Sequence, residues 1–170
     1  MNLVAVDYPR NGIDQEGWCR LAPDGCGGSW LAYVLEFDGP KESKGYFLLP
    51  GFTDLDVADS EFGDVVVKCI GGRVYLICEA GIALLPCDYY GYSQMVVSTE
   101  CIAFSNHLEL LVIHVDGVVR HDYDFVVGNL EIVSLGESDI KLKGMLTPGE
   151  GDEQWSLALE EIPAVEVTFL

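Results

Sequence analysis

Short apolar segments separated by turn residues run through the whole chain. The segments are rich in valine, isoleucine, leucine, tyrosine and phenylalanine, and glycine, proline, aspartate and asparagine stand between them. This composition favours β-strands joined by tight turns. Strands are expected at about residues 2–7, 18–22, 29–37, 45–50, 64–70, 73–79, 81–85, 93–98, 101–105, 108–115, 118–125, 129–135, 139–146, 154–160 and 163–169. The pattern therefore predicts an all-β fold.

One segment has the features of a helical turn instead. In TDLDVADSEF, Thr53 is a suitable N-cap, and the acidic residues that follow suit the positive end of a helix. A short helical turn is therefore expected over residues 53–62.

The segment LELLVIHVDGVVRHDYDF predicts a hairpin. Asp116 and Gly117 tolerate the positive φ angles of a type I′ turn, which joins two strands through a two-residue loop. One face of this hairpin would carry Leu110, Val112, His114, Val119, His121 and Tyr123. The opposite face would carry Leu111, Ile113, Val115, Val118, Arg120 and Asp122. Because both faces are apolar near the turn, the strands are expected to be covered on both sides, as in a β-sandwich or a barrel.

A second hairpin is expected at Gly71–Gly72, within VVVKCIGGRVYLICE. Gly72 and Gly117 lie about 45 residues apart, close to the period of propeller blades. The polar stretch LTPGEGDEQ is interpreted as a loop and not as an interdomain linker. We therefore expect a single antiparallel β-domain over residues 1–170, a sandwich or barrel-like fold of many short strands. A propeller-like arrangement is the alternative.

The charge of the chain narrows the range of its ligands. It has 28 Asp and Glu against 9 Lys and Arg, which gives a formal net charge of -19. Nucleic acid and anionic membrane surfaces are expected to be repelled, because binding to either requires clustered cations. A field of this sign attracts basic proteins and speeds their encounter. The alternative interpretation is that the acidity only maintains solubility.

Segment composition favours a cytoplasmic location. The N-terminal MNLVAVDYPRNGIDQ has no basic stretch followed by a long apolar run, and no run reaches the roughly 18 apolar residues of a membrane-spanning helix. The six cysteines form no C-x-x-C pair and stand mostly in apolar runs, as buried thiols do in a reducing compartment. Disulfides are the alternative if the protein is secreted.

The sequence lacks the common catalytic motifs: a G-x-S-x-G elbow, a Walker loop, a G-x-G-x-x-G turn and H-E-x-x-H. His107, His114 and His121 are evenly spaced, and the expected hairpin makes His114 and His121 diagonal neighbours on one face. A zinc site needs a third ligand, which the pattern does not supply. Hydrogen bonding to Asp122 or Asp124 is therefore the favoured interpretation, and we expect no enzyme activity, no metal and no cofactor.

Two segments are candidates for contact with a partner. The first is an acidic cluster that departs from an EF-hand calcium loop, because Ala58 stands where an oxygen ligand is required. Its candidate residues are Asp54, Asp56, Asp59 and Glu61. The second is CDYYGYSQ, which combines tyrosine with glycine and serine as binding loops on β-scaffolds do. Its candidate residues are Asp88, Tyr89, Tyr90 and Tyr92. A solvated acidic loop and a core-facing tyrosine corner are the alternative interpretations.

Small size, a strongly acidic composition, all-β patterning and missing catalytic motifs together resemble the bacterial immunity proteins that neutralise polymorphic toxins. The resemblance lies in overall character. It implies a stoichiometric inhibitor that binds a cognate basic toxin domain directly and occludes its active site or substrate channel. Charge attraction would steer the encounter, and burial of an aromatic and acidic patch would hold the complex together.

Two other classes of function stay open. A non-catalytic β-scaffold or adaptor module within a larger assembly would associate through an apolar sheet edge. A hydrolase or sugar-binding enzyme would use a pair of carboxylates.

Overall fold

The computed structural model describes residues 1–170 except residues 11, 24–26, 38–42, 63–64, 89 and 124–125, and over residues 57–62 it describes the backbone only. The strands are β1 (Asn2–Val6), β2 (Trp18–Leu21), β3 (Leu31–Glu36), β4 (Lys44–Leu48), β5 (Val57–Phe62), β6 (Val65–Ile70), β7 (Arg73–Cys78), β8 (Gly81–Leu84), β9 (Gln94–Val97), β10 (Cys101–Ser105), β11 (Leu110–His114), β12 (Val119–Asp122), β13 (Gly128–Leu135), β14 (Asp139–Met145) and β15 (Glu153–Ala158). Two 3-10 turns, η1 (Gly12–Asp14) and η2 (Leu159–Glu161), complete the elements of these described ranges. The predicted all-β fold is confirmed.

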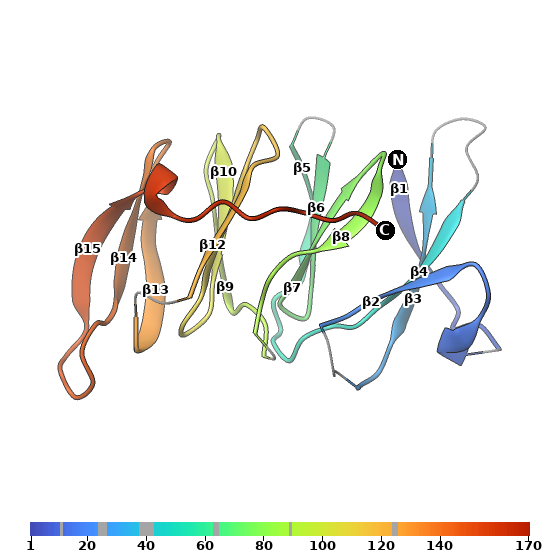
Figure 1. Cartoon of the computed structure of the whole chain (residues 1–170), viewed down its shortest axis with the longest axis horizontal. Coiled ribbons are helices and arrows are strands. Elements are labelled where there is room, and N and C mark those ends of the chain that lie inside the picture. Colours follow the sequence, from blue (N-terminus) through green and yellow to red (C-terminus); the bar gives the residue numbers. More distant parts are fainter. Residues whose placement is uncertain (11, 24–26, 38–42, 63–64, 89, 124–125) are drawn as a thin grey trace.

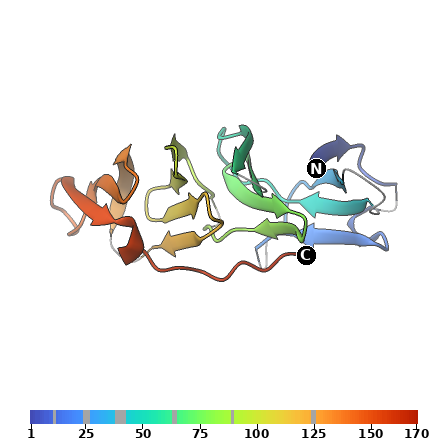
Figure 2. The ribbon, with the colours of Figure 1, turned by 90° about the horizontal axis from the view of Figure 1, so that it is seen from above.

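The strands form four sheets that stand in a row (Figures 1 and 2). The first sheet has the order β1-β3-β4-β2, the second β5-β6-β7-β8, the third β12-β11-β10-β9 and the fourth β13-β14-β15. Neighbouring strands are antiparallel, apart from the parallel pair β2 and β4. The strands form this row of open sheets in place of the closed barrel that the sequence allowed.

Three hydrophobic cores separate the four sheets. The first core lies between the first and second sheets, the second core between the second and third, and the third core between the third and fourth. Representative members are Leu35, Tyr46 and Tyr75 of the first core, Val67, Phe104 and Leu111 of the second, and Leu110, Ile132 and Leu142 of the third. Burial of apolar side chains in these cores therefore holds each sheet against its neighbour.

Strand β10 shows how a central sheet is covered on both faces. Ile102 and Phe104 belong to the second core, whereas Cys101 and Ala103 belong to the third. Alternate residues of a strand point to opposite faces, and all five residues of β10 are buried. The prediction that the strands of this region are covered on both sides is confirmed.

The outer faces of the first and fourth sheets, at the two ends of the row, are protected in different ways. On the outer face of the first sheet, the Trp18 ring stacks on Phe47 with centroids 4.6 Å apart. Gly45 leaves room for this indole, because a Cβ there would lie 2.5 Å from the Trp18 side chain. The outer face of the fourth sheet is polar, and Lys143 forms an ion pair with Glu131 at 3.5 Å. Covered or polar ends of this kind stop a stack of apolar faces from growing further.

The β11–β12 hairpin turns through Val115–Gly117 and not through a two-residue loop. The His114 N–H donates to the Val118 carbonyl, and the Gly117 N–H donates to the His114 carbonyl, each at 2.9 Å. Gly117 has a φ of 84°, but Asp116 does not have a positive φ. A type I′ turn needs positive φ at both central residues, whereas a three-residue loop needs one left-handed glycine at its end. The predicted turn type is therefore wrong.

The longer turn shifts the hairpin register by one residue and changes which side chains share a face. Leu111 pairs with His121, on the face that lines the second core. His114 pairs with Cys101, which faces the third core. A shift of one residue moves a strand's side chains to the opposite face. The prediction that His114 and His121 lie on one face is therefore wrong.

Strand β5 takes the place of the predicted helical turn. The backbone of Val57–Phe62 pairs with β6, with an irregularity between Val57 and Ser60. Thr53 does not cap a helix, since its hydroxyl donates to the Tyr92 carbonyl at 2.8 Å. Pairing with a neighbouring strand outweighs a weak local preference for helix.

The spacing of about 45 residues between Gly72 and Gly117 does not mark a structural repeat. Gly72 follows the second strand of the second sheet, whereas Gly117 follows the third strand of the third sheet. Both sheets are nevertheless four-stranded meanders, which is the form of a propeller blade. The spacing that suggested a propeller therefore does not correspond to a repeat, and the four sheets stand in a row.

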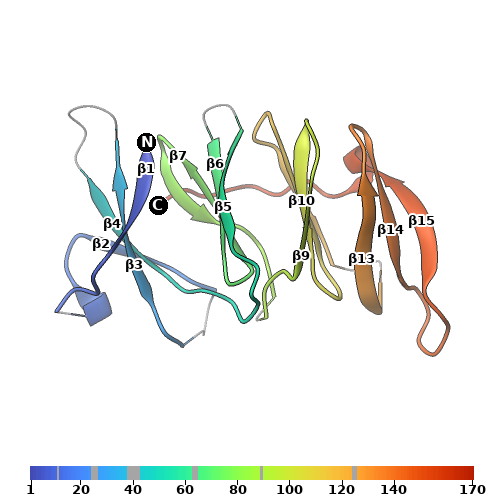
Figure 3. The same cartoon turned by 180° about the vertical axis from the view of Figure 1, so that it is seen from behind.

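Residues 163–170 cross the row of sheets as one extended segment, which we name the strap (Figures 1 and 3). The sequence predicts a strand here, and alternate side chains from Val165 to Phe169 do pack against the second core. In the described part of the chain, the one β-bridge of the strap joins Ala164 to Arg120. The strap therefore runs across the sheets and does not join any of them as a strand.

Gly117→Ala is expected to lower the free energy of unfolding by about 1 kcal/mol, because alanine disfavours a φ of 84°. A Cβ at this position would meet nothing within 4 Å, so the loss is purely conformational. Denaturation with urea measures it. Gly128→Ala is the matched control, because its Cβ also meets nothing within 4 Å and its φ is not positive. Equal losses in the two variants would contradict the turn geometry.

Candidate functional site

Three connections meet at one end of the second sheet: the loop after β4, the β6–β7 turn and the loop after β8. The Thr53 N–H donates to the Gly71 carbonyl at 3.2 Å, and the Tyr92 N–H donates to the Gly72 carbonyl at 2.7 Å. We name this meeting point the glycine junction, and it consists of residues 49–56, 71–72, 85–88 and 90–93. Its backbone hydrogen bonds join loops that are far apart in the sequence.

Glycine is required where these loops touch. Gly72 has a φ of 86°, and a Cβ there would lie 2.3 Å from the Tyr92 carbonyl oxygen. A Cβ on Gly51 would lie 2.2 Å from the Gly71 carbonyl oxygen. Real Cβ atoms do not approach backbone oxygens so closely, so each of these positions excludes a larger residue. The close approach fixes the positions of all three loops relative to one another.

The glycine junction brings the two predicted contact segments together. The Phe52 N–H donates to the Tyr90 carbonyl at 3.2 Å, and the two side chains are 64% and 60% exposed. Asp54 and Asp56 are exposed in the same loop as Phe52. We name the surface formed by Phe52, Asp54, Asp56 and Tyr90 the acidic–aromatic face. It combines residues of the acidic cluster and of the tyrosine loop.

Two of the candidate aspartates also hold the backbone of the junction. Asp56 Oδ1 accepts a hydrogen bond from the Gly71 N–H at 2.7 Å. Asp88 Oδ1 accepts from two N–H groups of its own loop, including that of Tyr90, each at 2.9 Å. The exposed side chain of Asp54 forms no hydrogen bond or ion pair with the described part of the chain. Asp54 is thus fully available to a partner, whereas Asp88 shapes the tyrosine loop.

The remaining candidate residues lie elsewhere or outside the described structure. Tyr92 is 0% exposed in the second core, and its hydroxyl donates to the Pro86 carbonyl at 2.6 Å. Burial raises the pKa of this phenol well above its ordinary value. Tyr92 therefore matches the alternative interpretation of a core-facing tyrosine, and it cannot contact a partner. Tyr89 lies outside the described residues, and so do the side chains of Asp59 and Glu61, whose backbone belongs to β5.

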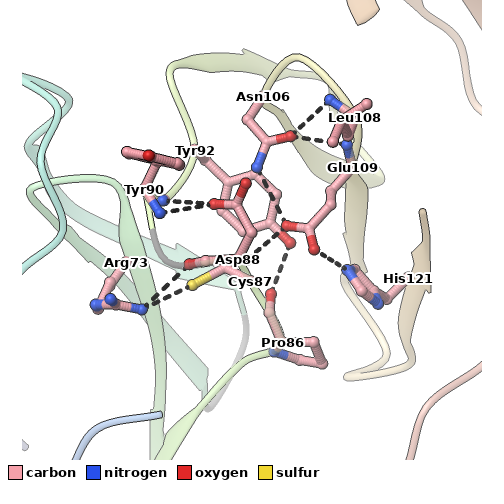
Figure 4. A network of polar contacts seen from close by, with 11 residues as sticks. Arg73, Pro86, Cys87, Asp88, Tyr90, Tyr92, Asn106, Leu108, Glu109 and His121 are labelled. Atoms are coloured by element: carbon pink, nitrogen blue, oxygen red, sulfur yellow. Dashed lines mark hydrogen bonds and ion pairs between the residues drawn. The ribbon is translucent and has the colours of Figure 1, made fainter. Parts of the chain in front are cut away.

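A buried polar network supports the tyrosine loop from below (Figure 4). Glu109 Oε2 accepts from the Asp88 N–H at 2.7 Å and from Asn106 Nδ2 at 3.1 Å. From the second sheet, Arg73 Nη1 donates to Cys87 Sγ at 3.2 Å. The loop is thus held from both of the sheets that it connects, so the backbone that bears the exposed Tyr90 is held in place.

Phe52, Arg73 and Glu109 are functional residues that were not predicted from the sequence. Arg73 and Glu109 are single charges in the apolar runs RVYLIC and LELLVIH, and a charge in such a run needs a buried partner. The position of each charge therefore predicts a buried polar partner for both residues, although it does not predict which loop they hold. Phe52 has no local signal, because its exposure results from the meeting of three loops.

His121 extends this network to the third sheet. Its Nε2 lies 3.9 Å from Glu109 Oε1, and the two side chains are only 10% and 12% exposed. Burial lowers the pKa of His121, while the negative charges of Glu109 and Asp122 act in the opposite direction. Burial likewise lowers the pKa of His114 on the other face of the sheet. Both imidazoles are therefore harder to protonate in the folded chain than in the unfolded chain.

Two hollows differ in their relation to the acidic–aromatic face. A recess of about 170 Å³ adjoins Phe52, and its other lining residues are Gly27, Gly28, Ser29, Leu49, Pro50, Gly51 and Arg73. A wider cleft of about 460 Å³ lies between the third and fourth sheets and includes His114, Arg120 and Glu160 in its lining. Only the recess shares residues with the glycine junction, where it offers room for a small apolar group beside the Phe52 ring.

The chemistry of the junction favours contact over covalent reaction. Burial raises the pKa of Cys87 to about 11 and that of Cys69 to about 12, so both thiols are protonated at neutral pH and are poor nucleophiles. Among the described residues, no group of three or more His, Cys, Asp or Glu side chains is placed to hold a metal ion. The acidic–aromatic face presents rings and carboxylates that suit apolar and cationic groups of another molecule.

Comparison of the chain with protein-family models, curated proteins and solved structures gives no match. The described ranges also contain no helix with the length and apolar character needed to cross a bilayer. The glycine junction and the surface that it creates are therefore the basis for assigning a function.

Acidification is expected to destabilise the fold through His121. Because its folded-state pKa is lower than the ordinary 6.5, the unfolded chain takes up the proton first, and stability falls as the pH drops below that value. His121→Gln removes this proton uptake and should make the free energy of unfolding less steep between about pH 6.5 and 5. Urea denaturation over a pH series measures the slope, with the exposed His107→Gln as the control. The same slope in wild type and His121→Gln would refute this role of His121.

Proposed function

We propose that this chain is a non-catalytic binding protein that captures a basic protein partner through the acidic–aromatic face. The observation that supports this most strongly is that the glycine junction sets Phe52 and Tyr90, 64% and 60% exposed, beside Asp54 and Asp56. The proposed partner is a toxin domain whose active site the face occludes. The chain would then be a bacterial immunity protein that acts in the cytoplasm.

Charge favours the encounter with such a partner. A net charge of -19 creates a field that speeds association with a basic protein by roughly 10- to 1000-fold at low salt. Asp54 can meet a cation without first losing a bond within the described chain. Asp56 uses Oδ1 to hold Gly71, and its Oδ2 stays available to accept from a lysine or arginine of the partner.

The two rings supply the contact area that charge alone does not. Buried aromatic anchors at the centre of an interface carry much of its binding energy, while the charged rim mainly sets the association rate. Hydrogen bonds between backbone groups hold the loops of Phe52 and Tyr90 before any partner arrives. A surface fixed in this way loses less conformational entropy on binding than a mobile loop does.

The product of any toxin gene adjacent to this chain's gene is the partner to test, by calorimetry for the affinity and by stopped-flow measurement for the association rate. Phe52→Ala and Tyr90→Ala are each expected to weaken binding by about 2 kcal/mol, the size of a hot-spot contact. Asp54→Asn should lower the association rate at low salt and have little effect at high salt, because salt screens exposed charges.

Glu150→Gln is the matched control for Asp54→Asn, because it removes the same charge from an exposed loop before β15. It should leave the affinity unchanged and alter the association rate less than Asp54→Asn does. No binding of wild type at low ionic strength would refute the proposal. Equal effects of Asp54→Asn and Glu150→Gln would place the interface elsewhere.

An adaptor role is the second candidate, and the first sheet supplies the observation that favours it. Strand β1 lies at the edge of this sheet, where Val4 and Val6 are 39% and 38% exposed. Exposed apolar edge strands pair with other chains. If the adaptor role holds, light scattering of the chain alone at high salt, which screens the repulsion between copies, should show an oligomer that the double substitution Val4→Lys with Val6→Lys dissociates. A monomer under these conditions would count against it.

A further inference from the structure

The cleft of about 460 Å³ between the third and fourth sheets, which stand side by side in Figure 1, has walls that are tied together. One wall consists of the β13–β14 turn and η2, which are joined because the Leu159 N–H donates to the Ser138 carbonyl at 2.9 Å. The other wall belongs to the third sheet. Arg120 connects the two, since its Nη1 donates to the carbonyls of Glu160 and Ile162 at 3.2 and 2.7 Å. The cleft is therefore preformed, and its volume lies within the range of about 300 to 1,000 Å³ that is usual for small-molecule sites.

Strands β11 and β12 set His114 beside Arg120 in the third-sheet wall. Arg120 pairs with Val112, two residues before His114, and alternate residues of a strand share a face. Val112 belongs to the third core, so both polar side chains lie on the face that borders the cleft. Burial lowers the pKa of His114, Asp116 raises it, and the positive charge of Arg120 lowers it further. This last effect requires the two side chains to be close, so the wall presents a guanidinium and an imidazole together.

Each of these two side chains has a buried nitrogen that forms no hydrogen bond within the described ranges. These atoms are Nε of Arg120 and Nε2 of His114. Nη2 of Arg120 likewise has no partner among the described residues, because Nη1 makes both of the hydrogen bonds of this guanidinium. The N–H groups of Nε and Nη2 form a fork that can bind both oxygens of a carboxylate. Since buried polar nitrogens normally have a partner, the arrangement indicates an acceptor from outside the chain.

Three carboxylates line the same cleft and restrict which acceptor can enter it. Glu137 and Asp139 lie at the β13–β14 turn, and Glu160 lies in η2. All three residues are exposed. Three carboxylates against the one guanidinium of the described lining leave an excess of two negative charges when His114 is neutral. A simple anion would be repelled by this excess, and a simple cation would leave the two buried nitrogens unpaired. A ligand that carries both a carboxylate and a cation meets both requirements.

We propose that this cleft binds a basic amino acid, arginine or lysine, either free or as the C-terminal residue of a peptide. Its α-carboxylate accepts from Nε and Nη2 of Arg120 and from Nε2 of His114, since a neutral imidazole can carry its hydrogen on either nitrogen. Its cationic side chain lies near the three carboxylates of the opposite wall. The cleft shares no described residue with the acidic–aromatic face, so this site does not rest on the function proposed above.

NMR titration of the isotope-labelled full chain tests the proposal, with L-arginine as the first probe. We expect saturable shifts at His114 and Arg120 at millimolar ligand. L-Argininamide lacks the carboxylate, and L-citrulline lacks the cation at nearly the same shape. Each should bind about tenfold more weakly or worse, because it loses charge-assisted hydrogen bonds that the cleft offers. The absence of saturable shifts with L-arginine would overturn the proposal, and so would equal binding of either analogue.

A peptide ligand distinguishes the two sources of a basic amino acid. Acetylglycyl-L-arginine keeps the carboxylate and the guanidinium of L-arginine but has an amide in place of the α-ammonium. Tighter binding of this peptide than of L-arginine would identify a peptide end as the ligand. Weaker binding of the peptide would identify the free amino acid.

Two variants test the residues of the cleft. Arg120→Lys keeps the positive charge but removes the fork, and it should weaken L-arginine binding by about tenfold or more. Arg120 also holds the Ile162 carbonyl, so Glu137→Gln supplies a test at an exposed position that makes no ion pair with the described chain. It should weaken the binding of L-arginine severalfold and leave that of L-citrulline unchanged.

Glu153→Gln is the matched control for Glu137→Gln, because it removes the same charge from an exposed position of β15 outside the cleft. It should bind L-arginine nearly as wild type does. Equal weakening in Glu137→Gln and Glu153→Gln would show that L-arginine responds only to the overall charge, and this result would overturn the proposed site.

Discussion

Burial of both faces of the second and third sheets is the constraint on which the rest of this structure depends. A sheet between two cores has no fully solvated face, so we expect its fully buried polar groups at strand ends. The buried polar residues of the described chain follow this rule, since Arg73 opens β7, Ser105 closes β10 and Asn106 follows it. Each is held by hydrogen bonds, as with Ser105 Oγ, which donates to Gln94 Oε1 at 2.9 Å. Packing in layers therefore concentrates polar chemistry in the connections.

The same constraint explains why the acidic–aromatic face lies where it does. Connections between successive sheets must pass the ends of the strands, and two of them meet the β6–β7 turn at one place. They can touch only where glycine replaces a side chain, as at Gly51 and Gly72. Once the backbones touch, side chains such as Phe52 and Tyr90 have no core position left and stay exposed. The proposed contact surface is thus a consequence of how the sheets are linked.

The sequence predicts the strands well because each depends on local composition. It fails where the result depends on a single angle or on a distant partner. One residue of loop length at Gly117 decides on which core face His121 lies, and the pair Asp116–Gly117 suits both turns. The acidic cluster and the tyrosine loop are visible as segments, but their meeting depends on backbone contacts between distant glycines. Phe52 could not be predicted for the same reason.

Electrostatics and apolar packing act at separate places in this molecule. The strap packs three apolar side chains against the second core and keeps Glu166 outside. The acidic–aromatic face instead places two aspartates where their field reaches solvent. The net charge of -19 that would attract a basic partner also keeps copies of the chain apart. The strap's own side chains therefore cover this edge of the second core, whereas the carboxylates of the acidic–aromatic face are open to solvent.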